Sequence, residues 1–152
     1  RKVDGTWYYL NPDASSGHPL GSMLTGWIYQ GRYWYYLNSI SDGTKGAMVH
    51  GWRTINGNKY YFLPESANGN PEGSMATGWC KIDDEWYYFN TGYNCQPVGS
   101  VLVNHWLTDG DKKYYLKEDG KMACGETLEI NGESFGFDES GGCVVTINFD
   151  KI

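Results

Sequence analysis

The sequence predicts an all-β protein, a β-solenoid of about six repeated β-hairpins that are joined by loops. Two observations favour this fold class. Paired aromatic residues recur along the chain at nearly constant spacing, and turn-forming residues separate short runs of aromatic and β-branched residues. No window shows the sustained i, i+3, i+4 spacing of apolar residues that is typical of an amphipathic helix.

The segment 51–62 shows the repeated unit in its clearest form. Its centre, Asn56-Gly57, favours a type I′ turn, because both central residues of that turn need a positive φ. The flanking runs 52–55 and 58–62 are rich in aromatic and β-branched residues, which suit a half-buried pleated surface. We therefore predict a β-hairpin over this segment.

Three markers define the repeat. The first is a triplet ending in two tyrosines, with the copies Trp7-Tyr8-Tyr9, Trp34-Tyr35-Tyr36, Lys59-Tyr60-Tyr61, Trp86-Tyr87-Tyr88 and Lys113-Tyr114-Tyr115. The second is a tryptophan seven residues before a triplet, found as Trp27, Trp52, Trp79 and Trp106. The third is an apolar residue four positions before that tryptophan, found as Met23, Met48, Met75 and Leu102. Successive triplets lie 25 or 27 residues apart, so the repeat covers most of the chain.

We expect a single repeat domain over residues 1–152, with units of about 1–26, 27–51, 52–78, 79–105, 106–125 and 126–152. The segment 1–6 matches 53–58, so the chain is expected to begin just after a missing Gly-Trp pair and to be a fragment of a longer protein. The other hairpins are expected to turn at Gln30-Gly31, Asp83-Asp84 and Asp109-Gly110. Loops rich in Pro, Asn and Gly follow the first four hairpins and exceed the usual hairpin link.

The sixth unit departs from the pattern. Glu126 stands where a tryptophan is expected, one extra residue precedes Ser134, and Cys143 takes the methionine position. The ending 144–149 alternates like a strand. Terminal repeats of solenoids are usually atypical caps, so we expect this unit to close the domain rather than to bind a ligand.

The composition argues against several functions. The formal net charge of −6 disfavours nucleic-acid binding, which depends on Lys and Arg. We expect no membrane span, because no sufficiently long apolar run is present. The four cysteines have no C-x-x-C spacing, which disfavours zinc, and both a disulfide and free thiols stay open for Cys80, Cys95, Cys124 and Cys143.

Catalytic chemistry finds little support in the sequence. The histidines at positions 18, 50 and 105 have no spaced Cys or Ser partner, and Asp83-Asp84-Glu85 is interpreted as a solvated turn. We therefore expect no catalytic residue, no metal and no cofactor in this segment, and an attached catalytic domain elsewhere is compatible with that expectation.

The aromatic residues suggest a binding function. Because side chains alternate along a strand, Trp34 and Tyr36 share one face of a hairpin, and Tyr35 lies on the other. Trp27 and Trp34 are expected to be cross-strand neighbours, as are Trp79 and Trp86. Rings from two successive hairpins can then form a cage for a quaternary ammonium group. The same rings suit the flat faces of sugars, and simple core packing is the third possibility.

The Gly-Trp pairs, the triplets and the segments Gly21–Trp27 and Gly73–Trp79 resemble the choline-binding (cell-wall-binding) repeats of Gram-positive bacteria and their phages. The resemblance covers residues 1–143. Related repeats occur in glucan-binding domains of glucosyltransferases and in clostridial toxins. The resemblance implies a left-handed β-solenoid with ligand cages between consecutive units, although four units here are longer than the family's usual repeat.

Carried onto this sequence, the resemblance implies the following cages. One consists of Trp27, Trp34, Met48 and Tyr61, and another consists of Trp79, Trp86, Leu102 and Tyr115. A third consists of Trp7, Met23 and Tyr36. A fourth, with Trp52 and Tyr88, carries Lys59 in place of a ring, and Trp106 faces the same substitution at Lys113.

The implied function is that of a non-catalytic cell-wall-binding module. It would bind choline, as teichoic-acid phosphocholine, and attach a secreted parent protein to the bacterial cell surface. One alternative is an oligosaccharide-binding module of the glucan or toxin type. Another is a surface adhesin or structural spacer whose long loops contact host proteins.

Overall fold

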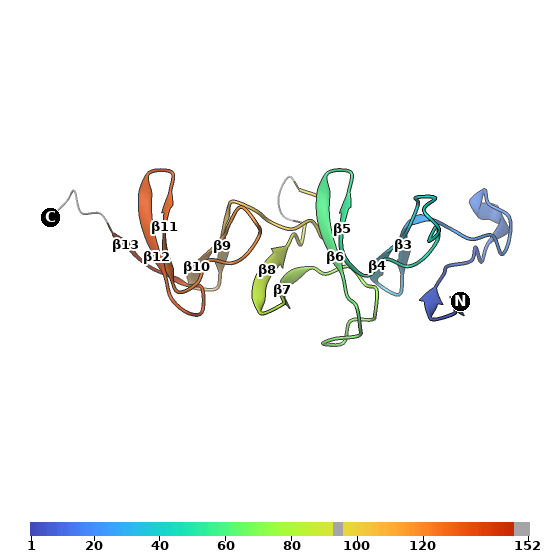
Figure 1. Ribbon diagram of the computed structural model, residues 1–152, viewed down its shortest axis with the longest axis horizontal. Coiled ribbons are helices and arrows are strands. Elements are labelled where there is room, and N and C mark those ends of the chain that lie inside the picture. The colour runs from blue at the N-terminus through green and yellow to red at the C-terminus, as the bar shows by residue number, and fades with distance from the viewer. Residues whose placement is uncertain (93–95, 148–152) are drawn as a thin grey trace. The chain divides into compact units, whose positions relative to one another are not determined.

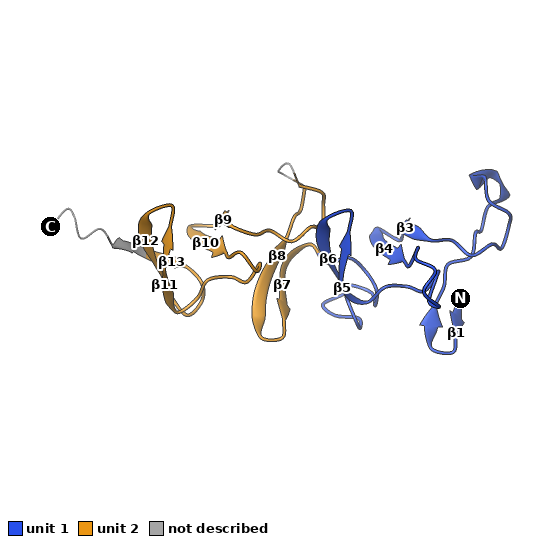
Figure 2. Ribbon diagram, turned by 45° about the horizontal axis from the view of Figure 1, so that its top comes forward, with its two compact units in different colours: residues 1–76 blue, residues 77–152 orange. Residues whose placement is uncertain are grey.

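The computed structural model describes residues 1–92 and 96–147. Its described part contains antiparallel hairpins and no α-helix, with a single turn of 3₁₀-helix, η1 (Ala14–Ser16), in the first loop (Figure 1). The all-β hairpin-repeat fold class is therefore confirmed. The chain forms two compact units, Arg1–Ala76 and Thr77–Ile152 (Figure 2).

The first unit contains three hairpins. Their strands are β1 (Lys2–Val3) with β2 (Thr6–Trp7), β3 (Gly26–Gln30) with β4 (Tyr33–Leu37), and β5 (Gly51–Ile55) with β6 (Asn58–Phe62). Within the described part, the second unit also contains three hairpins. Their strands are β7 (Gly78–Ile82) with β8 (Glu85–Phe89), β9 (His105–Asp109) with β10 (Lys112–Leu116), and β11 (Glu126–Ile130) with β12 (Glu133–Phe137), to which β13 (Cys143–Ile147) adds a third strand.

Two-residue turns connect the strands of the hairpins. Asn56 and Gly57 have φ of 51° and 81°, which confirms the predicted type I′ geometry. The Asp83-Asp84 turn is also confirmed. Two other predicted turns were wrong by one residue. Gln30 and Asp109 still pair with the opposite strand, so the turns fall at Gly31-Arg32 and 110–111.

A short bridge after each hairpin fixes the methionine position. Leu37 bridges to Met48, and Phe62 bridges to Met75 in the same way. In the next repeat the bridge joins Phe89 to Val101, so Val101 and not Leu102 occupies the methionine register. The physical reason is one additional residue before Trp106, in a segment where Asn104 has a φ of 49°.

Glycines make room for these methionines. A Cβ built on Gly73 would lie 2.5 Å from Cε of Met48, and Cβ atoms on Gly46 and Gly141 would overlap Met23 and Met122 in the same way. Met23, Met48 and Met122 therefore each lie over a glycine of the following loop. This packing explains why glycine precedes methionine by two residues in the repeat.

Buried asparagines organise three of the long loops. Nδ2 of Asn38 donates to the Ile40 carbonyl, to Asp42 and to Thr44, while Oδ1 accepts from the guanidinium of Arg53 at 2.7 Å. Asn11 and Asn90 donate to carbonyls of their own loops in a similar manner. The sequence signal was available, since each of these asparagines lies two residues after a Tyr-Tyr pair, but the predictions above did not use it.

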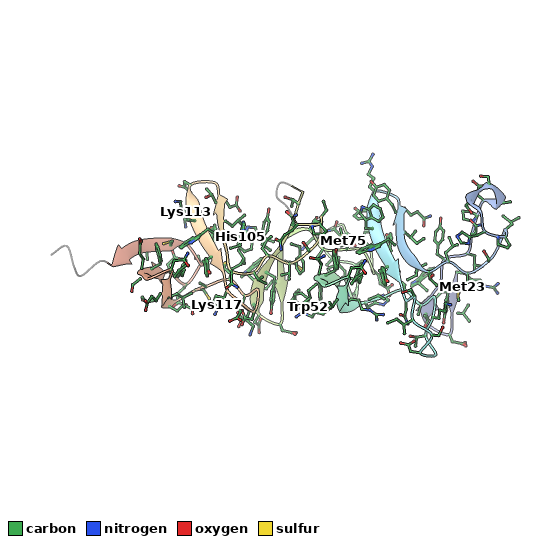
Figure 3. All side chains as sticks on the ribbon, turned by 90° about the horizontal axis from the view of Figure 1, so that it is seen from above. Met23, Trp52, Met75, His105, Lys113 and Lys117 are labelled. Carbon is green, nitrogen blue, oxygen red and sulfur yellow. The ribbon has the colours of Figure 1, made fainter. Side chains whose placement is uncertain are left out.

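The sixth hairpin differs from the expectation. Thr127 lies opposite Gly136, which is the register of the repeat tryptophan, and Glu126 therefore occupies the preceding glycine position. There is no extra residue before Ser134. Cys143 does take the methionine position, because it bridges to Phe137. Glu126 instead forms an ion pair of 3.3 Å with Lys117 (labelled in Figure 3).

The core of each unit lies between consecutive hairpins. In the first unit a cluster of Tyr36, Val49, Ile55, Tyr60 and Phe62 packs with Trp27 and Met75. In the second unit Leu102, Leu116 and Met122 pack with Trp79, Tyr88 and Tyr114. Ring-on-ring packing thus supplies much of the burial that Leu, Ile and Val supply in other folds.

Candidate functional site

Two tryptophans of the second hairpin stand at right angles on one face. The ring centroids of Trp27 and Trp34 are 6.1 Å apart with an interplanar angle of 88°. The predicted neighbour relation is confirmed, but it is diagonal: Trp27 lies directly opposite Tyr36, and Trp34 lies directly opposite Tyr29. Such diagonal partners are within reach of large aromatic side chains.

The third hairpin and the loop that follows it add one residue each, Tyr60 and Met75. The ring of Tyr60 packs edge-on against Trp27, with centroids 5.0 Å apart at 74°. The backbone N–H of Met75, labelled in Figure 3, donates to the Trp34 carbonyl at 2.8 Å. We call Trp27, Trp34, Tyr60 and Met75 the first cage.

The second unit repeats this arrangement. The rings of Trp79 and Trp86 are 6.3 Å apart at 90°, and Tyr114 packs on Trp79 at 5.2 Å and 72°. The backbone N–H of Met122 donates to the Trp86 carbonyl at 2.8 Å. We call Trp79, Trp86, Tyr114 and Met122 the second cage. The agreement in both distance and angle shows that one geometry has been built twice from separate parts of the sequence.

Each cage has a buried side and an open side. Trp34 and Trp86 are 41% and 40% exposed, whereas Tyr60 is buried and Tyr114 is half-buried. The Tyr60 phenol is neutral in neutral solution, and burial raises its pKa further above the ordinary value. A ligand can approach the exposed tryptophan and meet uncharged ring faces.

The structure does not bring Tyr61 or Tyr115 to the predicted cages. Tyr61 packs on Trp52 at 5.2 Å, and Tyr115 packs on Trp106 at 5.0 Å. Tyr60 and Tyr114 instead face the preceding hairpin, and the tyrosine after each lies on the opposite face, because neighbouring residues of a strand point to opposite faces. Met48 was predicted to lie beside Trp34, but it lies one repeat earlier, beside Trp7. Its N–H donates to the Trp7 carbonyl at 2.9 Å.

Trp7 lines a pocket of about 490 Å³ in the first unit. Among its lining residues are the apolar and aromatic Tyr9, Ile28, Tyr35, Leu37 and Met48, and the polar Arg1, Gln30, Ser66 and Glu72. Of the partners predicted for Trp7, Tyr36 packs on Trp27 at 5.2 Å and Met23 bridges to Leu10. We call this cavity the Trp7 pocket.

In the third hairpin a lysine stands over a tryptophan. Nζ of Lys59 lies 4.5 Å from the ring centroid of Trp52, within the range of a cation–π contact. Lys59 occupies the position that Trp34 has in the second hairpin. The predicted partners Trp52 and Tyr88 belong to different compact units, and Tyr88 packs on Trp79 at 5.2 Å.

Two phenylalanines of the sixth hairpin pack on Trp106, although the sequence had not predicted aromatic partners for it there. Phe135 packs on it at 4.9 Å and Phe137 at 5.8 Å. The glycine at position 136 does not deprive Trp106 of a ring, because position 136 belongs to the other face of the strand. Phe135 takes the position that Tyr60 has in the first cage. Lys113 stands at the second tryptophan position of this hairpin (Figure 3).

The sequence left the state of the cysteines open and disfavoured a zinc site. Cys80, Cys124 and Cys143 are free thiols, and Cys95 lies outside the described residues. Burial raises the pKa of the Cys80 thiol. Throughout the described ranges, no three His, Cys, Asp or Glu side chains gather in a way that suits a metal ion. In the same ranges, every helix is too short or too polar to cross a membrane.

Comparison with known proteins gives consistent matches. A choline-binding repeat model matches residues 49–92, and a cell wall binding repeat model matches 1–13 and 104–122. A search of curated proteins gives no match. The solved structure of CbpJ from Streptococcus pneumoniae TIGR4 is 28% identical with a TM-score of 0.73, over 98% of this chain and 47% of that chain.

Two further structures carry related repeats. CbpF in complex with ipratropium is 32% identical with a TM-score of 0.69, over 95% of this chain and 38% of that chain. The modular Cpl-1 endolysin, complexed with a peptidoglycan analogue, is 30% identical with a TM-score of 0.51, over 63% of this chain and 25% of that chain. The present chain thus spans less than half of each of these proteins. The repeat models, the fold and the twice-built aromatic cage agree with the sequence markers, and the chain belongs to the choline-binding repeat family.

Proposed function

We propose that the first and second cages each bind the trimethylammonium group of choline. The observation that carries this proposal is the recurrence of one geometry, two perpendicular tryptophans with a tyrosine and a methionine from the next repeat, in both compact units. Core packing alone would not require the second tryptophan of each cage to stay about 40% exposed.

The arrangement suits a quaternary ammonium ion for physical reasons. The faces of aromatic rings carry negative potential, and each good cation–π contact contributes about 0.5–2 kcal/mol. Perpendicular rings turn their faces toward a common point, so that a round cation meets more than one face. The backbone N–H groups of Met75 and Met122 hold the following loop against the exposed tryptophan of each cage.

The proposed role is that of a non-catalytic module that attaches a larger protein to the bacterial cell wall through the phosphocholine of teichoic acids. The similarity to choline-binding proteins supports this role, as do the match to a cell wall binding repeat and the repetition of the cage. Two sites on one chain increase the apparent affinity for a polymer that carries many cholines. Contacts of the loops with host proteins stay a prediction.

The Trp7 pocket favours a second candidate function, the binding of an oligosaccharide. Its volume of about 490 Å³ falls in the range of pockets that hold drug-sized ligands. Aromatic rings for stacking and the polar side chains of Gln30, Ser66 and Glu72 line the same cavity, which is the combination that a sugar needs. The pocket is therefore a site where a sugar residue or a third choline would bind.

Calorimetric titration with choline tests the principal proposal, with ethanolamine and a dextran oligosaccharide as comparison ligands. Trp34→Ala is expected to remove one class of choline site and Trp86→Ala the other, while the double variant loses both. Ethanolamine is expected to bind much more weakly, because it lacks the methyl groups. Binding of dextran with indifference to choline would favour the oligosaccharide function instead.

Two adjacent tyrosines provide a matched control. Tyr114 faces the second cage, and Tyr115 faces Trp106 on the other side of the same strand. Tyr114→Leu is expected to weaken choline binding roughly 2- to 30-fold, which corresponds to the loss of one cation–π contact. Tyr115→Leu should leave the second cage intact. Equal effects of the two substitutions would contradict the assignment of Tyr114.

A further inference from the structure

The two cages differ at one position of the following hairpin. The first strand of that hairpin ends with Ile55 beside the first cage and with Asp109 beside the second. Both residues lie three positions after a repeat tryptophan, and both are the last residue of the strand to pair across the hairpin. The structural repeat therefore makes them equivalent, although one is apolar and the other is an acid.

These two side chains have different surroundings. Ile55 is buried in the cluster that contains Tyr60 and Phe62. Asp109 is exposed, and its Oδ2 accepts a hydrogen bond of 2.9 Å from the indole N–H of Trp79. A carboxylate thus touches the edge of one wall of the second cage, and the first cage has no such group at this position.

Other residues around the two cages differ in charge as well. In the second cage, Lys112 lies directly opposite Asp109, and Lys81 lies directly opposite Trp86. In the first cage, Arg53 lies directly opposite Tyr60 and donates to Asn38, while Tyr29 lies opposite Trp34. Lys81 and Lys112 also have no charged counterpart at the equivalent positions of the first cage, but among these residues it is Asp109 that hydrogen-bonds to a cage tryptophan.

We propose that Asp109 determines the affinity and the charge selectivity of the second cage, an inference that rests on the choline-binding function proposed above. The carboxylate attracts a cationic ligand and holds the plane of the Trp79 ring. By accepting the hydrogen bond from the indole N–H it also increases the electron density of that ring, which strengthens its attraction for a cation. The second cage then favours cations over neutral molecules of the same shape more strongly than the first cage does.

The size of the effect follows from the distance and the exposure. A unit charge about 6 Å from the ligand, in surroundings close to those of water, changes the affinity roughly threefold. Because Asp109 is exposed, added salt screens this attraction. The contribution of ring contacts alone would not depend on salt in this way.

The test uses the full chain carrying Trp34→Ala, and choline binding that is lost when Trp86→Ala is added to it is assigned to the second cage. Choline and its uncharged isostere 3,3-dimethylbutan-1-ol are titrated at low and at high ionic strength. Asp109→Asn keeps an oxygen that accepts the indole hydrogen bond but removes the charge. It is expected to weaken choline binding about threefold at low salt, to have little effect at high salt, and to leave binding of the isostere unchanged.

Asp111→Asn is the matched control, since it removes an equal charge from the turn that follows Asp109. Asp109→Ile copies the first cage and is expected to lose both the charge and the hydrogen bond, so that binding of the isostere also falls. Equal effects of the Asp109→Asn and Asp111→Asn substitutions, or a loss that persists at high salt, would overturn the proposal. If the unsubstituted chain does not bind choline, the proposed function fails and this inference fails with it. If it binds choline and Asp109→Asn changes nothing, this inference alone fails.

Discussion

Tyr60 of the third hairpin packs edge-on against Trp27 of the second, with ring centroids 5.0 Å apart. The neighbouring residue, Tyr61, points away and packs on Trp52 of its own hairpin. The third hairpin thus presents its first tyrosine to the preceding hairpin and its second tyrosine to its own tryptophan, because consecutive residues of a strand lie on opposite faces. This division of faces explains how a chain of hairpins can build one aromatic cluster after another.

Gly73→Ala is expected to destabilise the first unit through overlap with Met48. The added Cβ would lie 2.5 Å from the methionine Cε, and the expected cost is about 1 kcal/mol, the low end for overpacking, because the flexible end of the methionine can shift. Gly69→Ala is the control, because both glycines have a φ of 81° and a Cβ on Gly69 meets only open space. Urea unfolding measures both variants. Equal losses for the two would show that backbone strain alone is responsible.

Asn38→Ala is expected to lower the free energy of unfolding by about 1–3 kcal/mol, because several partly buried polar groups lose their hydrogen-bond partner. These groups include the Ile40 N–H and the guanidinium of Arg53. Limited proteolysis should then cut the loop 39–45 faster, and urea unfolding gives the energetic cost. Asn70→Ala, at an exposed position, serves as the control. A stable Asn38 variant with an uncut loop would contradict the proposed anchoring.

Lys59→Gln removes the cation that stands over Trp52. The expected loss is about 0.5–1 kcal/mol of stability, in line with exposed cation–π contacts, together with a change in tryptophan fluorescence. Lys59→Arg keeps a cation over the ring and should retain most of the stability. The interaction has no energetic importance if the Gln and Arg variants unfold at the same urea concentration.

Alkaline pH is expected to destabilise the first unit through Tyr60. Burial raises the pKa of its phenol above the ordinary value of 10.0, so the folded state favours the neutral form. The stability that this provides is complete below about pH 10 and is lost as the pH rises through the raised pKa of the folded state. Unfolding measured from pH 8 to pH 11 should show the decline, and Tyr60→Phe should make it shallower. An unchanged slope in that variant would assign the decline to other groups, among them Tyr35, whose pKa burial also raises.

Much of the local structure was predictable from the sequence. Asn56-Gly57 specified a type I′ turn because few residues tolerate two consecutive positive φ angles. The alternation of side chains placed Trp34 and Tyr36 on one face, which the contacts of Trp27 confirm. The exact turn was missed where Gly31 allows two positions, since a glycine fits either central residue of the turn.

The partner of each tryptophan was harder to predict. The sequence offers two consecutive tyrosines and a methionine in every repeat, and period-two alternation states only that the tyrosines face opposite ways. Nothing local specifies which face the next hairpin turns toward Trp27 or Trp79. The cages were therefore expected to contain Tyr61 with Met48 and Tyr115 with Leu102, whereas the structure unites Tyr60 with Met75 and Tyr114 with Met122.

The sequence by itself determined the hairpins, their period, the choline-binding repeat family and the tryptophans that come in pairs, because turn chemistry and strand alternation act between residues close in the chain. The tertiary structure alone decided which tyrosine and methionine complete each cage, that Asp109 reaches the indole of Trp79, and that Lys59 covers Trp52. The cage contacts and the Asp109 contact depend on the rotation of one hairpin against the next and on the loops between them, whereas Lys59 reaches Trp52 within its own hairpin. That rotation follows from packing between residues about one repeat apart, and no local pattern records it.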